Sequence, residues 1–279
     1  MLTPAPLEIP EWRRPWLTPF ASILRDTLVN ELTHGTVRDD WRARFNALAS
    51  RQELTNHRGA PLHFVEQAAL PVQVAYEAFI SATGGVPTRE NHHDFFNALV
   101  WLTFSRSKAE LNAIQALEIE RGAAFQAVGV PSAIAFTRGT LRDRATIFDE
   151  NAALMLTCDA SLAEALVAHQ WRDALLVRRA DFGVVWEAML FGHALMEKLI
   201  KPYKAITAHV WVLQVDREFF DLPSEAKRQT VDCLLSQRLR QGMLALPAAH
   251  LPVLGVPGWW EGQDEIFYND TKVFRPKRV

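Results

Sequence analysis

The chain has 279 residues, 49% of them hydrophobic and 22% charged, and a formal net charge of -2. This composition is typical of a globular protein with a substantial core, and the nearly balanced charge argues against nucleic acid or an anionic membrane as a partner. No run of 18 apolar residues is present, which excludes an apolar membrane-spanning helix.

The two cysteines and the first residues indicate the compartment. Cys158 and Cys233 are 75 positions apart and do not form a metal-type pair, which fits a reducing environment. The N-terminus lacks the basic and continuous apolar regions of a secretion signal. We therefore expect a cytoplasmic protein. The basic residues among the last nine positions are interpreted as a solvated tail, so they do not change the expectation against nucleic acid.

The first half of the chain is expected to be helical. Residues 1–16 contain four prolines and two tryptophans, which predicts an extended N-terminal arm, and residues 17–279 are expected to form a single α+β domain. Apolar spacing, caps and breakers predict the helices in this half. Their predicted ranges are 18–32, 37–50, about 72–82, a buried helix that starts at Asn91, and 107–125.

The second half is expected to carry a small sheet. Short runs rich in Val, Ile, Trp and Phe predict buried strands at 152–157, 184–191 and 206–215, followed by a helix over 224–241. Fourteen residues separate the last two strands, enough for a crossover between parallel neighbours. The predicted fold is α+β, with a helix-rich first half packed on a small, mainly parallel sheet in the second half.

The first candidate site is the start of the helix at Asn91. His93, Asn97 and Trp101 are spaced i, i+4 and i+8 and share one face, and Asp94 lies beside His93 at the open end. A histidine backed by a carboxylate can act as a general base or a metal ligand, whereas simple capping is the alternative. His93 and Asp94 are candidate catalytic residues, and Asn97 and Trp101 are candidate ligand-binding residues.

The second candidate site is the polar sequence Asp149-Glu150-Asn151, which interrupts an apolar stretch. We expect a turn or bulge at the mouth of the first strand. Two carboxylates in such a place could hold a divalent ion or divide acid and base duties, although turn chemistry alone also explains them. Asp149 and Glu150 are candidate ligand-binding residues.

The third candidate site begins at His193, where a predicted strand is followed by a short helix. Open α/β sheets bind ligands at such corners, and the amides of a first helical turn favour an anion. His193 and Glu197 are an i, i+4 pair in which the carboxylate can orient the imidazole, so both are candidate catalytic residues. Lys198 and Lys201 are candidate ligand-binding residues for a negative group.

The fourth candidate is His209, an ionisable residue on an otherwise apolar strand face. Glu187 has the same character on the preceding strand. If these strands are parallel neighbours, a contact between Glu187 and His209 would give each buried group a partner. His209 is therefore a candidate ligand-binding residue, with a purely structural hydrogen bond as the alternative.

Several separated stretches carry a family resemblance. They resemble a bacterial family known as domain of unknown function 3025 (DUF3025), over about residues 60–279. The resemblance implies a single bacterial domain and brings no activity, cofactor or catalytic residue with it. The stretches are Asn91–Trp101, Phe148–Asn151, Phe191–Lys198, Pro202–His209 and Phe267–Pro276.

The preferred functional hypothesis is a hydrolase that acts on a small anionic ligand through histidine acid/base chemistry. It requires that His93 and His193 converge on one cavity. A metal ion held by His93, Asp94, His193 and Asp149 is a variant of this hypothesis, and the sequence identifies no cofactor. The alternative is a non-catalytic ligand-binding or scaffolding protein in which the same polar residues form a buried structural network. Oligomeric state is left open by the sequence.

Overall fold

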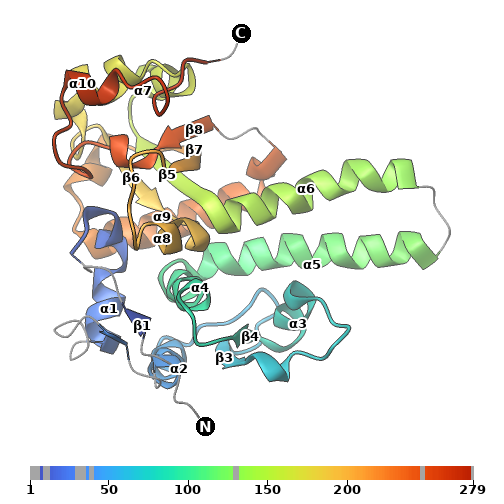
Figure 1. The fold of residues 1–279 in the computed structure, drawn as a ribbon. Coiled ribbons are helices and arrows are strands. Elements are labelled where there is room, and N and C mark those ends of the chain that lie inside the picture. The colour runs from blue at the N-terminus through green and yellow to red at the C-terminus, as the bar shows by residue number, and fades with distance from the viewer. Residues whose placement is uncertain are drawn as a thin grey trace.

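The computed structural model describes residues 7–8, 13–28, 36–37, 41–127, 132–245 and 249–277. Its α-helices are α1 (Ala21–Leu28), α2 (Trp41–Arg51), α3 (Tyr76–Thr83), α4 (His92–Thr103), α5 (Ser105–Ala127), α6 (Ser132–Asn151), α7 (Ala160–Val167), α8 (His193–Lys198), α9 (Ser224–Arg240) and α10 (Glu265–Tyr268). Its strands are β1 (Leu7–Glu8), β2 (Thr36–Val37), β3 (His63–Glu66), β4 (Gly85–Thr88), β5 (Ala152–Thr157), β6 (Trp186–Leu190), β7 (Thr207–Gln214) and β8 (Ala249–Pro252). Figure 1 shows this α+β arrangement, in which the N-terminal helices and the main sheet lie on opposite sides of α4 and α8.

The main sheet has the strand order β6-β5-β7-β8. The expectation of a mainly parallel sheet is wrong, because only β5 and β7 pair in parallel, whereas β6 and β8 each pair antiparallel with their neighbour. Strand β5 lies between β6 and β7, so the predicted contact between Glu187 and His209 does not form. Glu187 instead pairs with Lys227 of α9.

The sequence Asp149-Glu150-Asn151 is not a turn or bulge. These residues form the last turn of α6, and β5 begins directly at Ala152. The helix therefore passes into the central strand without a loop, which fixes the backbone of Asp149 and Glu150 at the edge of the sheet where β5 begins. Two-residue or shorter connections are among the tightest that helices and strands use.

Helix α4 is the buried centre of the molecule. Asn91 caps it as predicted, since its side-chain oxygen accepts a hydrogen bond of 2.8 Å from the backbone nitrogen of Asp94. All residues from Asp94 to Thr103 are buried, as expected of a helix that is apolar on most sides. Its first turn packs against α8, and this contact brings two distant parts of the chain together.

Helices α5 and α6 form a long antiparallel hairpin. In Figure 1 they run side by side and extend away from the rest of the molecule, with α4 and α8 at their base. Helix α5 was expected over 107–125, whereas no helix was expected over most of α6. The site described below lies at the base of this hairpin.

Replacing Gly192 by alanine is expected to destabilise the protein by about 2–3 kcal/mol through overpacking. Gly192 precedes α8, and an added Cβ would lie 2.5 Å from the backbone nitrogens of Asn151 and Ala152. Urea unfolding measures the change. Gly122→Ala in α5 is the matched control, because its Cβ meets nothing within 4 Å and should stabilise the helix by about 0.5–1 kcal/mol. Equal stability of the two variants would contradict the expectation.

The predicted N-terminal arm falls largely outside the described residues. Its last part is a 3-10 helix, Pro15–Phe20, in which Trp16 is buried with its ring 6.1 Å from that of Trp259. A single cluster of buried hydrophobic side chains extends from this point through the chain to Phe274. None of the described helices has the length and apolar character that crossing a membrane requires.

Candidate functional site

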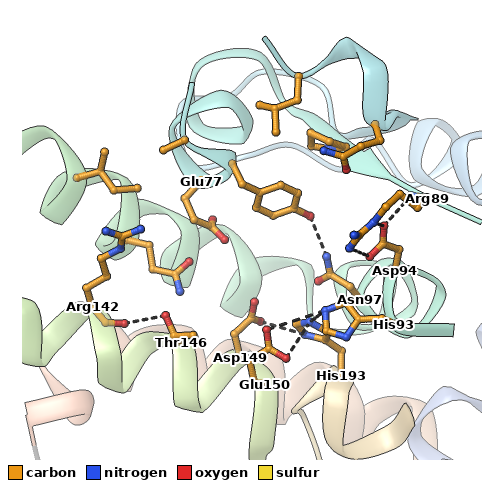
Figure 2. Close-up of a pocket in the computed structure, with 17 residues that line it drawn as sticks. Glu77, Arg89, His93, Asp94, Asn97, Arg142, Thr146, Asp149, Glu150 and His193 are labelled. Carbon is orange, nitrogen blue, oxygen red and sulfur yellow. Dashed lines mark hydrogen bonds and ion pairs between the residues drawn. The ribbon is translucent and has the colours of Figure 1, made fainter. Parts of the chain in front are cut away.

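A polar cavity of about 380 Å³ lies at the base of the α5–α6 hairpin. Helices α3, α4, α5, α6 and α8 all contribute side chains to its wall, and Figure 2 shows these side chains pointing toward one another. Its wall is rich in titratable groups. They are Tyr76, Glu77, Arg89, His93, Asp94, Arg142, Asp149, Glu150 and His193.

His93 and His193 meet at one end of this cavity. Their ring centroids are 4.5 Å apart with the planes at 75°, and their Nε2 atoms are 3.1 Å apart. His93 lies in the first turn of α4, and His193 is the first residue of α8. The structure thus confirms the convergence that the sequence hypothesis required, across 100 positions of the chain.

Three carboxylates surround the two imidazoles. Glu197 Oε2 lies 3.1 Å from Nδ1 of His93, and Asp149 Oδ1 lies 3.8 Å from Nδ1 of His193. Glu150 faces the gap between the rings, 3.5 Å from Nε2 of His193 and 4.0 Å from Nε2 of His93. Glu197 and Asp149 therefore lie near the Nδ1 atoms of His93 and His193, and Glu150 lies near both Nε2 atoms.

The expected partner of Glu197 was His193, four residues earlier on the same helix. The structure pairs Glu197 with His93 instead. His193 is buried against α4. The Glu197 side chain extends from α8 to His93 in the first turn of α4.

Burial sets the protonation of the inner groups. It lowers the pKa of His193 to about 4, opposed by the negative charge of Asp149. Burial raises the pKa of Glu150. For Asp149, burial acts to raise the pKa, but the positive charge of Lys108 leads a set of opposing effects that lowers it overall. At neutral pH the site thus contains a neutral His193 beside a charged Asp149.

A buried network supports the histidine pair, and its lysine was missed in the sequence. Lys108 Nζ donates to Asp149 Oδ1 at 2.5 Å and to Asn97 Oδ1 at 2.9 Å, and Asn97 donates to the Tyr76 hydroxyl at 2.9 Å. Trp101 does not line the cavity, and its ring lies 5.3 Å from Lys108 Nζ. The missed signal was a lysine in the first turn of a helix, where the macrodipole disfavours a cation that has no partner.

Two further cavity residues, Glu77 and Arg142, were also missed. Burial, reinforced by the charge of Asp149, raises the pKa of Glu77 to about 7, and the carboxylate accepts a hydrogen bond of 2.5 Å from Asn112. Arg142 lies on the same face of α6 as Glu150, at i, i+8 spacing. That spacing would have indicated a shared face if α6 had been predicted as a helix.

Asp94 lines the cavity but does not back His93. It accepts hydrogen bonds from the backbone nitrogen, Nε and Nη2 of Arg89 at 2.6, 2.9 and 3.0 Å. Adjacent residues of a helix point in different directions, so Asp94 turns away from the His93 ring. The backing carboxylate of His93 is Glu197.

The remaining predicted ligand-binding residues lie outside this cavity. Lys198 and Lys201 are exposed and do not line it. His209 is half-buried on β7, with Nδ1 3.2 Å from Asn151 Nδ2 and its ring centroid 5.2 Å from that of His250. The structure therefore does not bring these three residues to the histidine pair.

A second cavity, of about 890 Å³, lies beside β7 and β8 and is lined mainly by apolar side chains, with His169, His250 and basic residues of the segment 272–277. It is larger, but none of the described residues that line it is acidic. We therefore place the candidate site at the smaller cavity, where acids, bases and imidazoles converge.

Among the described residues, His93, Glu150 and His193 offer one ligand atom each, all within 4.8 Å of one another. Two imidazoles and one carboxylate with an open side form a donor set typical of catalytic zinc. The set expected from the sequence contained Asp94 and Asp149 in place of Glu150. Both aspartates are held by basic side chains, so Glu150 is the carboxylate that faces the imidazoles.

Comparison with known proteins gives one family. The model of the family described as "Protein of unknown function (DUF3025)" matches residues 62–278. Neither the curated proteins nor the solved structures gave a match. Because the matched range covers most of the 279 residues, the chain belongs to the DUF3025 family.

Proposed function

We propose that the protein is a hydrolase that activates water at His93, Glu150 and His193 and acts on a small ligand with an anionic group. The observation that carries this proposal is the meeting of two Nε2 atoms, 3.1 Å apart, at the wall of a polar cavity. A group that abstracts a proton must lie within hydrogen-bond reach of the water it activates, and a water molecule beside the two Nε2 atoms, on the side of the cavity, would meet this condition.

The carboxylates support this assignment. Glu197 holds one face of His93, and Glu150 lies on the inner side of both rings. A base that is itself oriented by a carboxylate is the common arrangement for water activation in hydrolases. The residues that matter come from three different helices, so the geometry exists only in the folded protein.

Arg142 is the candidate group for the anionic end of the ligand. It lies eight residues before Glu150 on one face of α6, which corresponds to about 12 Å along the helix axis. Both side chains line the same cavity of about 380 Å³. A ligand of metabolite size can thus place a carboxylate or phosphate at Arg142 and its scissile bond at the imidazoles. Arg142 replaces Lys198 and Lys201 in this role.

A non-catalytic binding protein is the alternative function. The buried hydrogen bonds of Lys108 with Asp149 and Asn97 favour it, because a structural network of this kind needs no reaction to explain it. The two functions differ in whether the protein turns a ligand over.

The test combines ligand binding with turnover. The full-length protein is screened by thermal shift against phosphorylated and carboxylated metabolites, and the stabilising compounds are then assayed for hydrolysis. We expect turnover, with kcat/KM lowered about 100-fold or more in Glu150→Gln and His93→Gln. Arg142→Gln should mainly raise KM, since it removes ground-state binding of the anionic group.

His92→Gln is the matched control, on the same helix and adjacent to His93. It should retain the activity. Stabilising ligands that are never hydrolysed, or equal turnover by wild type and Glu150→Gln, would reject the hydrolase in favour of the binding protein.

A further inference from the structure

The two imidazoles face each other in a geometry that suits a bound cation. An ionised carboxylate can only accept hydrogen bonds, so Glu197 at 3.1 Å fixes the hydrogen of a neutral His93 ring on Nδ1. Asp149 Oδ1 lies 3.8 Å from Nδ1 of His193, too far for a hydrogen bond, and this buried nitrogen has no hydrogen-bond partner among the described residues. The Nε2 lone pair of His93 therefore faces Nε2 of His193 at 3.1 Å. The gap holds either a hydrogen donated by Nε2 of His193 or a cation bound by both nitrogens.

The distances suit a metal ion. Two nitrogen ligands of a tetrahedral zinc ion lie about 3.3 Å apart, given zinc–nitrogen distances of about 2.0–2.1 Å. The Nε2 atoms are separated by 3.1 Å, and Glu150 lies 3.5 and 4.0 Å from them. The Glu150 side chain is 37% exposed, so it has room to adjust toward a shared ion.

The end of helix α6 also favours a cation at this point. Asp149 and Glu150 occupy its last turn, where the macrodipole already concentrates negative charge, and this turn contains no basic residue. Lys108 neutralises Asp149 from one side. Glu150 is left as the second carboxylate at the negative end of the helix, beside the two Nε2 atoms.

The outer carboxylates complete a recognisable metal site. Histidine ligands commonly donate their other ring nitrogen to a carboxylate, which fixes the tautomer and the ring orientation. Glu197 stands in this position for His93, 3.1 Å from its Nδ1. Asp149 Oδ1 lies near the corresponding nitrogen of His193, at 3.8 Å, without a hydrogen bond to it. Imidazole donors select first-row transition ions over Mg²⁺ and Ca²⁺, which prefer oxygen ligands.

We propose that His93, Glu150 and His193 bind one divalent transition-metal ion of the zinc class, with the side facing the cavity open to water. A bound ion of this class lowers the pKa of its water and supplies the nucleophile for hydrolysis. This catalytic role rests on the proposed function, whereas the binding of the ion does not. A proton shared by the two imidazoles is the competing occupant of the gap.

The test is a direct titration of the full-length protein with Zn²⁺ after treatment with a chelator. Calorimetry should give one Zn²⁺ per chain, and Co²⁺ should produce the visible absorption of a tetrahedral site. His93→Ala and Glu150→Gln should weaken Zn²⁺ binding at least 100-fold. Glu197→Gln, a positioning residue, should weaken it about 10-fold. Mg²⁺ should not compete at equal concentration.

His92→Ala is the matched control and should bind Zn²⁺ as wild type does. Circular dichroism checks that each variant folds, and His93 and Glu150 are suitable because both side chains are partly exposed. A chain that takes up no Zn²⁺, or a His93→Ala variant with unchanged affinity, would overturn the metal site and assign the gap to a shared proton. Zn²⁺ binding without turnover rejects only the proposed function, whereas turnover that survives chelation rejects only the catalytic role of the ion.

Discussion

Lys108→Met is expected to lower the free energy of unfolding by about 3–5 kcal/mol, because it leaves Asp149 as a buried charge without its partner. The lysine side chain is 4% exposed and that of Asp149 is 11% exposed. Their hydrogen bond of 2.5 Å joins the first turn of α5 to the last turn of α6. Methionine keeps the unbranched side chain as far as the ε position, so the loss mainly reports the charge and its hydrogen bonds. Urea unfolding at pH 7 with a chelator present measures it.

A double-mutant cycle separates the ion pair from packing. Combining Lys108→Met with Asp149→Asn removes both charges, and we expect the double variant to be more stable than the sum of the single losses predicts. Arg172→Met is the matched control, since it breaks an ion pair with Glu265 in which both side chains are about 60% exposed. It should cost less than about 1 kcal/mol. Similar losses for Lys108→Met and Arg172→Met would contradict the role given to burial.

Glu77→Gln is expected to remove a pH dependence of stability between about pH 5 and 8. Burial raises the pKa of Glu77 from 4.5 to about 7 in the folded protein. The folded state therefore holds this proton more tightly than the unfolded state does. Its contribution to stability is fully present below pH 4.5 and is lost as the pH rises through about 7. A glutamine cannot ionise, so the variant escapes this loss.

The expected size is about 1–3 kcal/mol, because a pKa shift of one unit corresponds to about 1.4 kcal/mol and the residue is only partly buried. The measurement is the difference in unfolding free energy between wild type and Glu77→Gln across this pH range. As the pH rises, the unfolding free energy of wild type should fall relative to that of Glu77→Gln. Glu261→Gln, on an exposed side chain, is the matched control. A wild-type advantage that grows with pH would contradict the assignment.

Local signals predicted the elements well where the chain carries strong patterns. Asn91 caps α4 as expected, and the runs rich in Val, Trp and Leu form β5, β6 and β7 close to their predicted bounds. The order of the strands was not predictable from those runs. A single sequence shows which residues are apolar. Whether two strands pair parallel or antiparallel depends on the connections between them, such as the direct passage from α6 into β5.

The candidate site was predicted in part. His93 and His193 were chosen because they are titratable residues at the ends of predicted elements in apolar surroundings. The structure brings them into contact. Their partners were assigned by nearness in sequence, which gave Asp94 to His93 and Glu197 to His193. The structure pairs His93 with Glu197 instead, because α4 and α8 pack against each other near their first turns. Helix α6 was not predicted, so the contribution of Arg142 to the cavity and the position of Glu150 beside both imidazoles were missed with it.

In Figure 1 the α5–α6 hairpin extends away from the rest of the molecule, with α4 and α8 at its base. A helix of 20 residues such as α6 is about 30 Å long, so the hairpin behaves as a stiff rod fixed at its base. Such a rod deflects most at its free end and least where it is clamped. At this base, Lys108 of α5 binds both Asp149 of α6 and Asn97 of α4, and so ties the hairpin to the buried centre of the molecule. We therefore expect that a force on α5 or α6 away from this base would displace the imidazoles least.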